Sequence, residues 1–125
     1  MLNSLKLLGL AIIIAFAPAK AMILTSLALV TADMITGIWA AKIKGEKITS
    51  SGLRRSVVKL FIYEVAVLLG FLTQQYLTGD SIPVASIIAG FVGLTELTSC
   101  LENLNTISGG DVLKTLIEQI GAFKK

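Results

Sequence analysis

The chain has 125 residues, of which 54% are hydrophobic, and its mean hydropathy is +0.83. This apolar content exceeds the roughly 45–50% of ordinary soluble domains, which excludes a soluble globular protein and favours a membrane protein. The formal net charge is +3 and Cys100 is the single cysteine, so an internal disulfide is excluded too. We therefore expect an all-α integral membrane bundle.

The apolar residues fall into runs of membrane-spanning size, which predict one membrane domain over residues 1–125 with three to four transmembrane helices. The first run, at 1–20, predicts a short hydrophobic helix fenced by Lys6, Pro18 and Lys20. The later predicted segments are a helix at 21–43, a basic loop at 44–56, helices at 57–78 and 83–105, and an amphipathic tail helix at 110–123.

The N-terminal run has an alternative interpretation. Lys6, the apolar stretch and the small-residue pattern "APAKA" together are also typical of a cleavable signal peptide. We favour a retained helix, because the residues after that pattern are at once hydrophobic again. Whether residues 5–19 span the bilayer or lie in its interface stays open, and so does the side that the N-terminus faces.

The tail combines a Gly-Gly break, a possible cap at Asp111 and apolar residues at helical spacing. The apolar positions are Val112, Leu113, Leu116, Ile117 and Ile120, and the polar ones opposite are Lys114, Glu118 and Gln119. This pattern is typical of a helix that lies on the membrane surface or against partner subunits.

Cations are concentrated around the predicted loop. They are Lys42, Lys44, Lys47, Arg54 and Arg55, followed by Lys59, against the single acid Glu46. The positive-inside rule places this loop in the cytoplasm, where each cation near an anionic leaflet contributes about 1 kcal/mol. We interpret the patch as a topology anchor, since a nucleic-acid site would interleave aromatic residues.

Three acids lie inside apolar segments: Asp33, Glu64 and Glu96. A charge at the bilayer centre costs about 2.5–3.5 kcal/mol. Counted from the predicted cytoplasmic helix ends, all three lie about 10–12 Å deep, which predicts one acidic layer without a lysine or arginine at its level. Protonated carboxyls, a water-filled lumen, or faces that meet in an oligomer would each make it tolerable. Glu102 lies nearer the interface, where we expect an ion pair with Lys59.

Small residues recur at helical spacing on the second and fourth apolar helices. They are Ser26, Gly37, Ala40 and Ala41 on one helix, and Ser86, Ala89, Gly90 and Gly93 on the other. Small-xxx-small patterns let membrane helices approach closely. The sequence leaves open whether these contacts form within one chain or between chains.

Two motifs resemble a known family. The stretch "DMITGIWAAKIKGEKITSSGLRRSVVKL" is similar to the D-x-x-x-G, basic, S-S-x-G signature of phage holins of the toxin-secretion and phage-lysis group, and "ELTSCLEN" resembles that group's E-x-x-S-x-x-E-N. The matching positions are Asp33, Gly37, Gly45, Ser50, Ser51, Gly52, Arg55, Lys59, Glu96, Ser99, Glu102 and Asn103. The likeness covers about residues 28 to 103. The family often has a glycine- and proline-containing segment next, whereas "LNTISGGDVL" lacks proline.

The resemblance implies a multi-pass protein of the bacterial (host) cytoplasmic membrane that forms homo-oligomers and a lesion. An endolysin or a secreted toxin would leave through it without stable binding. Apart from membrane lipids, the sequence predicts neither a nucleic-acid partner nor a cofactor or metal, and without a nucleophile triad or phosphate loop we expect no enzyme. The alternatives are a small cation or proton channel or transporter that uses the acids as relays, and a structural membrane protein that docks a soluble partner.

Overall fold

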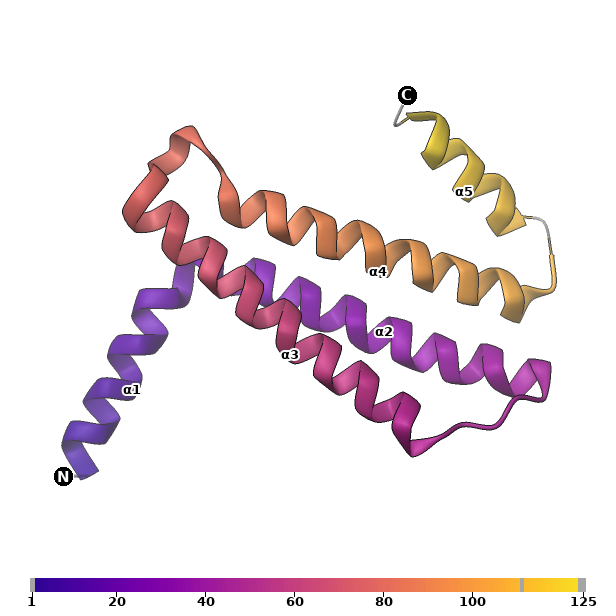
Figure 1. Cartoon of the computed structure of the whole chain (residues 1–125), viewed down its shortest axis with the longest axis horizontal. Coiled ribbons are helices and arrows are strands. Elements are labelled where there is room, and N and C mark those ends of the chain that lie inside the picture. The colour runs from indigo at the N-terminus through magenta and orange to yellow at the C-terminus, as the bar shows by residue number, and fades with distance from the viewer. Residues whose placement is uncertain (1, 111, 124–125) are drawn as a thin grey trace.

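The computed structural model describes residues 2–110 and 112–123, and these residues form helices without a strand. The helices are α1 (Leu2–Phe16), α2 (Lys20–Lys44), α3 (Ser50–Thr73), α4 (Val84–Ser108) and α5 (Val112–Phe123). In Figure 1, α2, α3 and α4 lie side by side, α1 projects from one end of this bundle, and α5 turns back over α4. The expected all-α bundle is confirmed.

Three helical stretches are long and apolar enough to cross a bilayer: Asn3–Lys44, Ser50–Ser81 and Val84–Ser108. Their outward faces carry large apolar side chains; Phe61 and Phe91 are each 70% exposed. A water-soluble protein of this size does not leave such continuous apolar surface open, but lipid covers it at no cost. The bundle is therefore a multi-pass membrane unit.

The basic loop is shorter than the sequence predicted. Gly45 ends α2 in the left-handed conformation (φ 74°), which glycine adopts without a steric penalty. Thr49 caps α3, because its Oγ1 accepts a hydrogen bond from the Gly52 amide at 3.1 Å. The loop thus holds five residues, 45–49, and Arg54 and Arg55 lie on the first two turns of α3. The predicted start at residue 57 is where α3 becomes apolar, whereas the helix itself begins at Ser50.

The opposite end of the bundle is held by close packing. A Cβ on Gly70 of α3 would lie 2.7 Å from Ile88 Cδ1 and 3.4 Å from the Ala85 Cα of α4, so a larger residue at this crossing would have to displace the end of the Ile88 side chain. The Gln74 side-chain oxygen accepts a hydrogen bond from the Ala85 amide at 3.1 Å. This bond satisfies an amide in the first turn of α4 and ties the α3–α4 hairpin together.

The two terminal helices differ in their surroundings. In α5, Ile117, Ile120 and Gly121 face Leu97 and Leu101 of α4, while the polar side chains of α5 are exposed. The predicted amphipathic tail helix is therefore present, although Asp111, its expected cap, lies outside the described residues. By contrast α1 projects away from the bundle.

Candidate functional site

An ion network joins the three packed helices at one level. The Lys59 ammonium of α3 lies 3.0 Å from Asp33 Oδ2 of α2 and 3.1 Å from Glu96 Oε2 of α4. The Asp33 and Glu96 side chains are 13% and 2% exposed, whereas that of Lys59 is 33% exposed. One cation thus neutralises two carboxylates in part, and the network carries a formal charge of −1.

Two residues of α4 donate further hydrogen bonds to Asp33. Ser99 Oγ donates to Asp33 Oδ1 at 2.6 Å, and Asn103 Nδ2 donates to the same oxygen at 3.0 Å. The Asn103 amide also lies 3.2 Å from the Asp33 carbonyl oxygen and 3.0 Å from Thr36 Oγ1. Gly37 lies next to this amide, since a Cβ there would be in ordinary van der Waals contact with Asn103 Nδ2 at 3.5 Å. Hydrogen bonds to a carboxylate are about twice as strong as neutral ones, so this cluster fixes α2 against α4.

Glu64 does not belong to this level, contrary to the predicted acidic layer. Its Oε1 accepts a hydrogen bond from Ser26 Oγ at 2.6 Å, and Ser26 precedes Asp33 by seven residues, about 10 Å along α2. The other oxygen, Oε2, is buried without a hydrogen-bond partner. The prediction failed because it counted depth from Val57, whereas α3 begins at Ser50.

The expected ion pair between Lys59 and Glu102 is also wrong, as is the expected absence of a cation near the acids. Both ion pairs found within residues 2–110 and 112–123 are those of Lys59 with Asp33 and Glu96. Helical phase explains the difference. Glu96, Ser99 and Asn103 share one face of α4, whereas Glu102 is rotated about 120° from Glu96 and is exposed.

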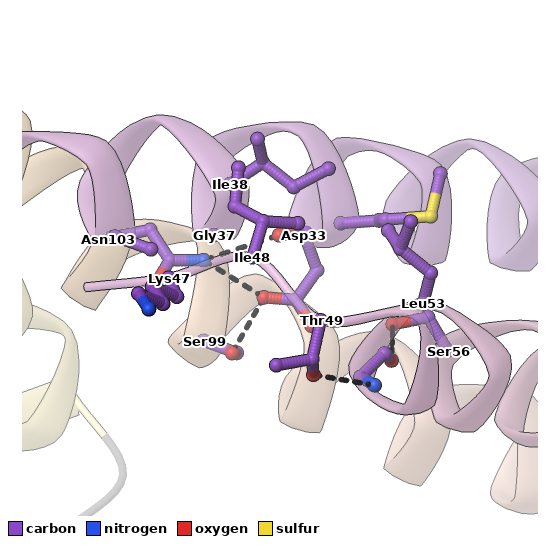
Figure 2. A pocket seen from close by; sticks show the side chains of 13 residues that line it. Asp33, Gly37, Ile38, Lys47, Ile48, Thr49, Leu53, Ser56, Ser99 and Asn103 are labelled. Atoms are coloured by element: carbon purple, nitrogen blue, oxygen red, sulfur yellow. Dashed lines mark hydrogen bonds between the residues drawn. The ribbon is translucent and has the colours of Figure 1, made fainter.

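A cleft of about 350 Å³ leads from the basic loop to Asp33. Figure 2 shows Asp33 between Ser99 and Asn103, with Ile48 and Thr49 of the loop lying across them. Lys47 also lines this cleft. Water can therefore reach the Asp33 side of the network without entering the apolar outer surface.

The other predicted basic residues surround this end of the bundle. Lys42 and Lys44 lie in the last turn of α2, where cations interact favourably with the helix dipole. Arg54 and Arg55 lie near the start of α3, and all four side chains are exposed. The predicted cationic patch is thus a surface feature next to the cleft.

Within the described part of the chain, no cluster of three or more His, Cys, Asp or Glu side chains is placed to hold a metal ion. The polar groups instead bond one another across helices.

Comparison with known proteins shows the family to which the chain belongs. The sequence profile of the bacteriophage holin family matches residues 10–125, nearly the whole chain and all of the ion network. The chain belongs to the bacteriophage holin family. No curated protein and no solved structure matches it. The family resemblance inferred from the two motifs is confirmed for this holin.

The small residues of this holin are divided between two environments. Ser26 and Ala40 are buried, Ala41 is half-buried, and Gly37 adjoins Asn103. Gly93 and Ala89 are half-buried, and a Cβ on Gly93 would meet Leu29 at 3.8 Å. Ser86 and Gly90 are exposed. Part of the small-residue surface therefore packs within the chain and part remains open.

Sequence reasoning missed how Ser99, Asn103 and Lys59 act in this holin. The motif supplied the positions without their contacts, and Ser26 was assigned to packing although it bonds Glu64. One signal was available: Glu96, Ser99 and Asn103 recur at spacings of three and four residues, which places three polar groups on one face of a membrane helix. Such a face requires polar partners on neighbouring helices.

Proposed function

We propose that this protein accumulates in the bacterial cytoplasmic membrane, oligomerises there and permeabilises it, so that an endolysin or a toxin leaves the cell. The observation that carries the proposal is the contrast between a polar interior and an apolar exterior. Lys59 compensates part of the charge of Asp33 and Glu96 inside a single chain, while the outward side chains are suited to lipid. A single chain can therefore reside in the membrane without opening it.

The same interior supplies polar groups for an aqueous lesion. Ion pairs out of water are stabilising only with good geometry and further hydrogen bonds, because desolvation costs several kcal/mol per ion. Lys59 is one-third exposed and the cleft reaches Asp33, whereas Glu96 is buried, so full hydration of this network needs a rearrangement of helices and not their unfolding. Turned toward a lumen, the three charges would line it.

Orientation follows from the cations. With Lys42, Lys44, Lys47, Arg54 and Arg55 at one end of the bundle, the positive-inside rule places that end in the cytoplasm. The cleft then opens toward the cytoplasm, and α1 leaves the bundle near the outer leaflet. Tagged termini and externally added protease provide a direct check of this topology.

The proposal is tested by induced expression in bacteria. A potential-sensitive dye reports the membrane potential, and a large cytoplasmic reporter enzyme reports leakage of folded protein. We expect the potential to collapse and the reporter to appear outside, whereas a vector control retains both. An intact potential with the protein present in the membrane fraction would refute the proposal, and loss of ions with full retention of the reporter would favour a channel instead.

A further inference from the structure

The first helix is nearly unpacked. Seven large apolar side chains of α1 are 51–68% exposed, and they point in all directions around the helix. A ring contact between Phe16 and Phe71, with centroids 5.8 Å apart, is located at the base of α1, where it joins the bundle. Figure 1 shows the rest of α1 projecting sideways from the bundle.

Neither a membrane-spanning nor an interfacial position suits the length and the apolar pattern of this helix. Its 15 residues extend about 22 Å, less than the roughly 30 Å of a hydrocarbon core. A helix that lies in the interface has one polar face, whereas the residues of α1 from Leu7 to Phe16 are apolar on every side. A helix that is apolar all round but too short to span is therefore accommodated better when a protein surface covers part of it.

A groove of about 350 Å³ lies between α2 and α4 at the same end of the bundle. Met22 and Ser26 of α2 line one wall and Ser86 and Gly90 of α4 the other. A Cβ on Gly90 would find nothing within 4 Å. The Thr25 hydroxyl in this groove already donates to the Ala21 carbonyl oxygen at 2.7 Å, so the groove can accept an apolar helix without leaving that donor unsatisfied.

We propose that α1 of one copy occupies the α2–α4 groove of a second copy. The inference rests on the proposed oligomeric function and names the contact that builds the oligomer. Ala11 and Ala15 of α1 are one turn apart, as are Ser86 and Gly90, so small residues on both sides permit close approach of the helices. The groove begins at the first residues of α2, directly after α1, which we call the arm. In neighbouring molecules of one membrane, the arm of one and the groove of the other therefore lie at the same end of the bundle.

Each contact between copies would be of modest area. The chain exposes 8842 Å² over 125 residues, so a 15-residue segment of average exposure contributes about 1000 Å². Burying half of α1 removes about 500 Å² from this helix and a similar area from the groove. Each contact then buries about 1000 Å² in total, the lower limit for a specific interface, and every chain makes two such contacts, one with its α1 and one with its groove. Because arm and groove are different surfaces, the contact propagates into a ring or an open array.

Disulfide cross-linking tests the exchange. In a Cys100→Ser background, a chain with Ala11→Cys and one tag is co-expressed with a chain that carries Gly90→Cys and a second tag. We expect an oxidised heterodimer with both tags in membranes, at about ten times the yield of a control pair that combines Ala11→Cys with Phe61→Cys, because a docked arm has a high effective concentration. Phe61 is 70% exposed on α3, away from the groove.

A chain that carries both Ala11→Cys and Gly90→Cys distinguishes the occupants. Exchange between copies yields a ladder of multimers, whereas a cross-linked monomer would show that α1 folds onto its own groove and would overturn the proposal. Ala15→Cys with Ser86→Cys repeats the test if the first pair fails to reach the membrane. Absence of cross-links from both pairs in cells that release the reporter enzyme overturns the arm exchange and leaves the holin function intact.

Discussion

Replacement of Lys59 by methionine tests the ion network most directly. The substitution keeps the apolar stem and removes the cation that lies 3.0 Å from Asp33 and 3.1 Å from Glu96. Loss of one partner from a buried pair costs about 3–5 kcal/mol. Lys59 is 33% exposed, and Asp33 keeps its bonds from Ser99 and Asn103, so we expect the lower end, about 3 kcal/mol. The bundle should therefore open about two orders of magnitude more often.

Cys100 reports this opening. It is 6% exposed, and its thiol lies 3.7 Å from the Leu29 carbonyl oxygen, between α4 and α2. A maleimide can reach it only when these helices separate, so its labelling rate in detergent micelles follows the open fraction. We expect Lys59→Met to label about a hundred times faster than the unmodified protein. The double variant Lys59→Met/Glu96→Gln should recover part of the protection, because only one uncompensated carboxylate remains.

Glu102→Gln is the matched control, since it removes a charge from α4 outside the network and should leave the labelling rate unchanged. Equal labelling of Lys59→Met and the unmodified protein would refute the assigned role of Lys59. A large effect of Glu102→Gln would instead support the ion pair between Lys59 and Glu102 that the sequence had predicted.

Three further tests, two of them with a matched control variant, have expected outcomes. Gly70→Val should lower the free energy of unfolding by about 1–3 kcal/mol, because its side chain would displace the end of Ile88 and crowd the Ala85 backbone. Gly90→Val should be nearly neutral in the isolated chain, and thermal unfolding followed by circular dichroism compares the two variants. Thr49→Ala removes the cap of α3 at a cost of about 1 kcal/mol, so amide hydrogen exchange in the first turn should accelerate about fivefold, while Thr49→Ser should not change it. Glu64→Met should raise stability by about 1 kcal/mol in the same unfolding assay, because it removes a buried oxygen without a partner; a loss of stability would show that the bond from Ser26 dominates.

The fold was largely predictable because membrane helices follow from hydropathy, but the level of each side chain was not. Depth depends on where a helix begins, and the polar first turns of α3 carry no hydropathy signal of their own. This error displaced Glu64 by about two turns and hid the proximity of Lys59 to Asp33. The long, flexible stem of lysine contributed as well, since a cation can serve a level some distance from its Cα.

The face of the helix on which a residue lies, by contrast, could be predicted from its position in the sequence. The stripe that joins Ser26, Asp33, Gly37 and Ala40 was visible in the sequence, and these residues do face the interior. Which of them bond and which only pack depends on the register between helices that are far apart in the chain. A single sequence does not contain that register, so the cross-helix partners of Asp33 required the structure.

The two ends of the bundle are held by different forces, which predicts an order of events in assembly. The end with the basic loop is fixed by the ion network, whereas the opposite end combines close packing at Gly70 with the open groove. A neighbour's arm can fill the groove without disturbing Lys59, so arm docking should precede opening of the network. Gly90→Val, which blocks the groove, should then delay permeabilisation even in combination with Lys59→Met, which alone should hasten it. Dye-reported collapse of the membrane potential after induction measures the delay; a double variant as early as Lys59→Met alone would place network opening first and contradict this order.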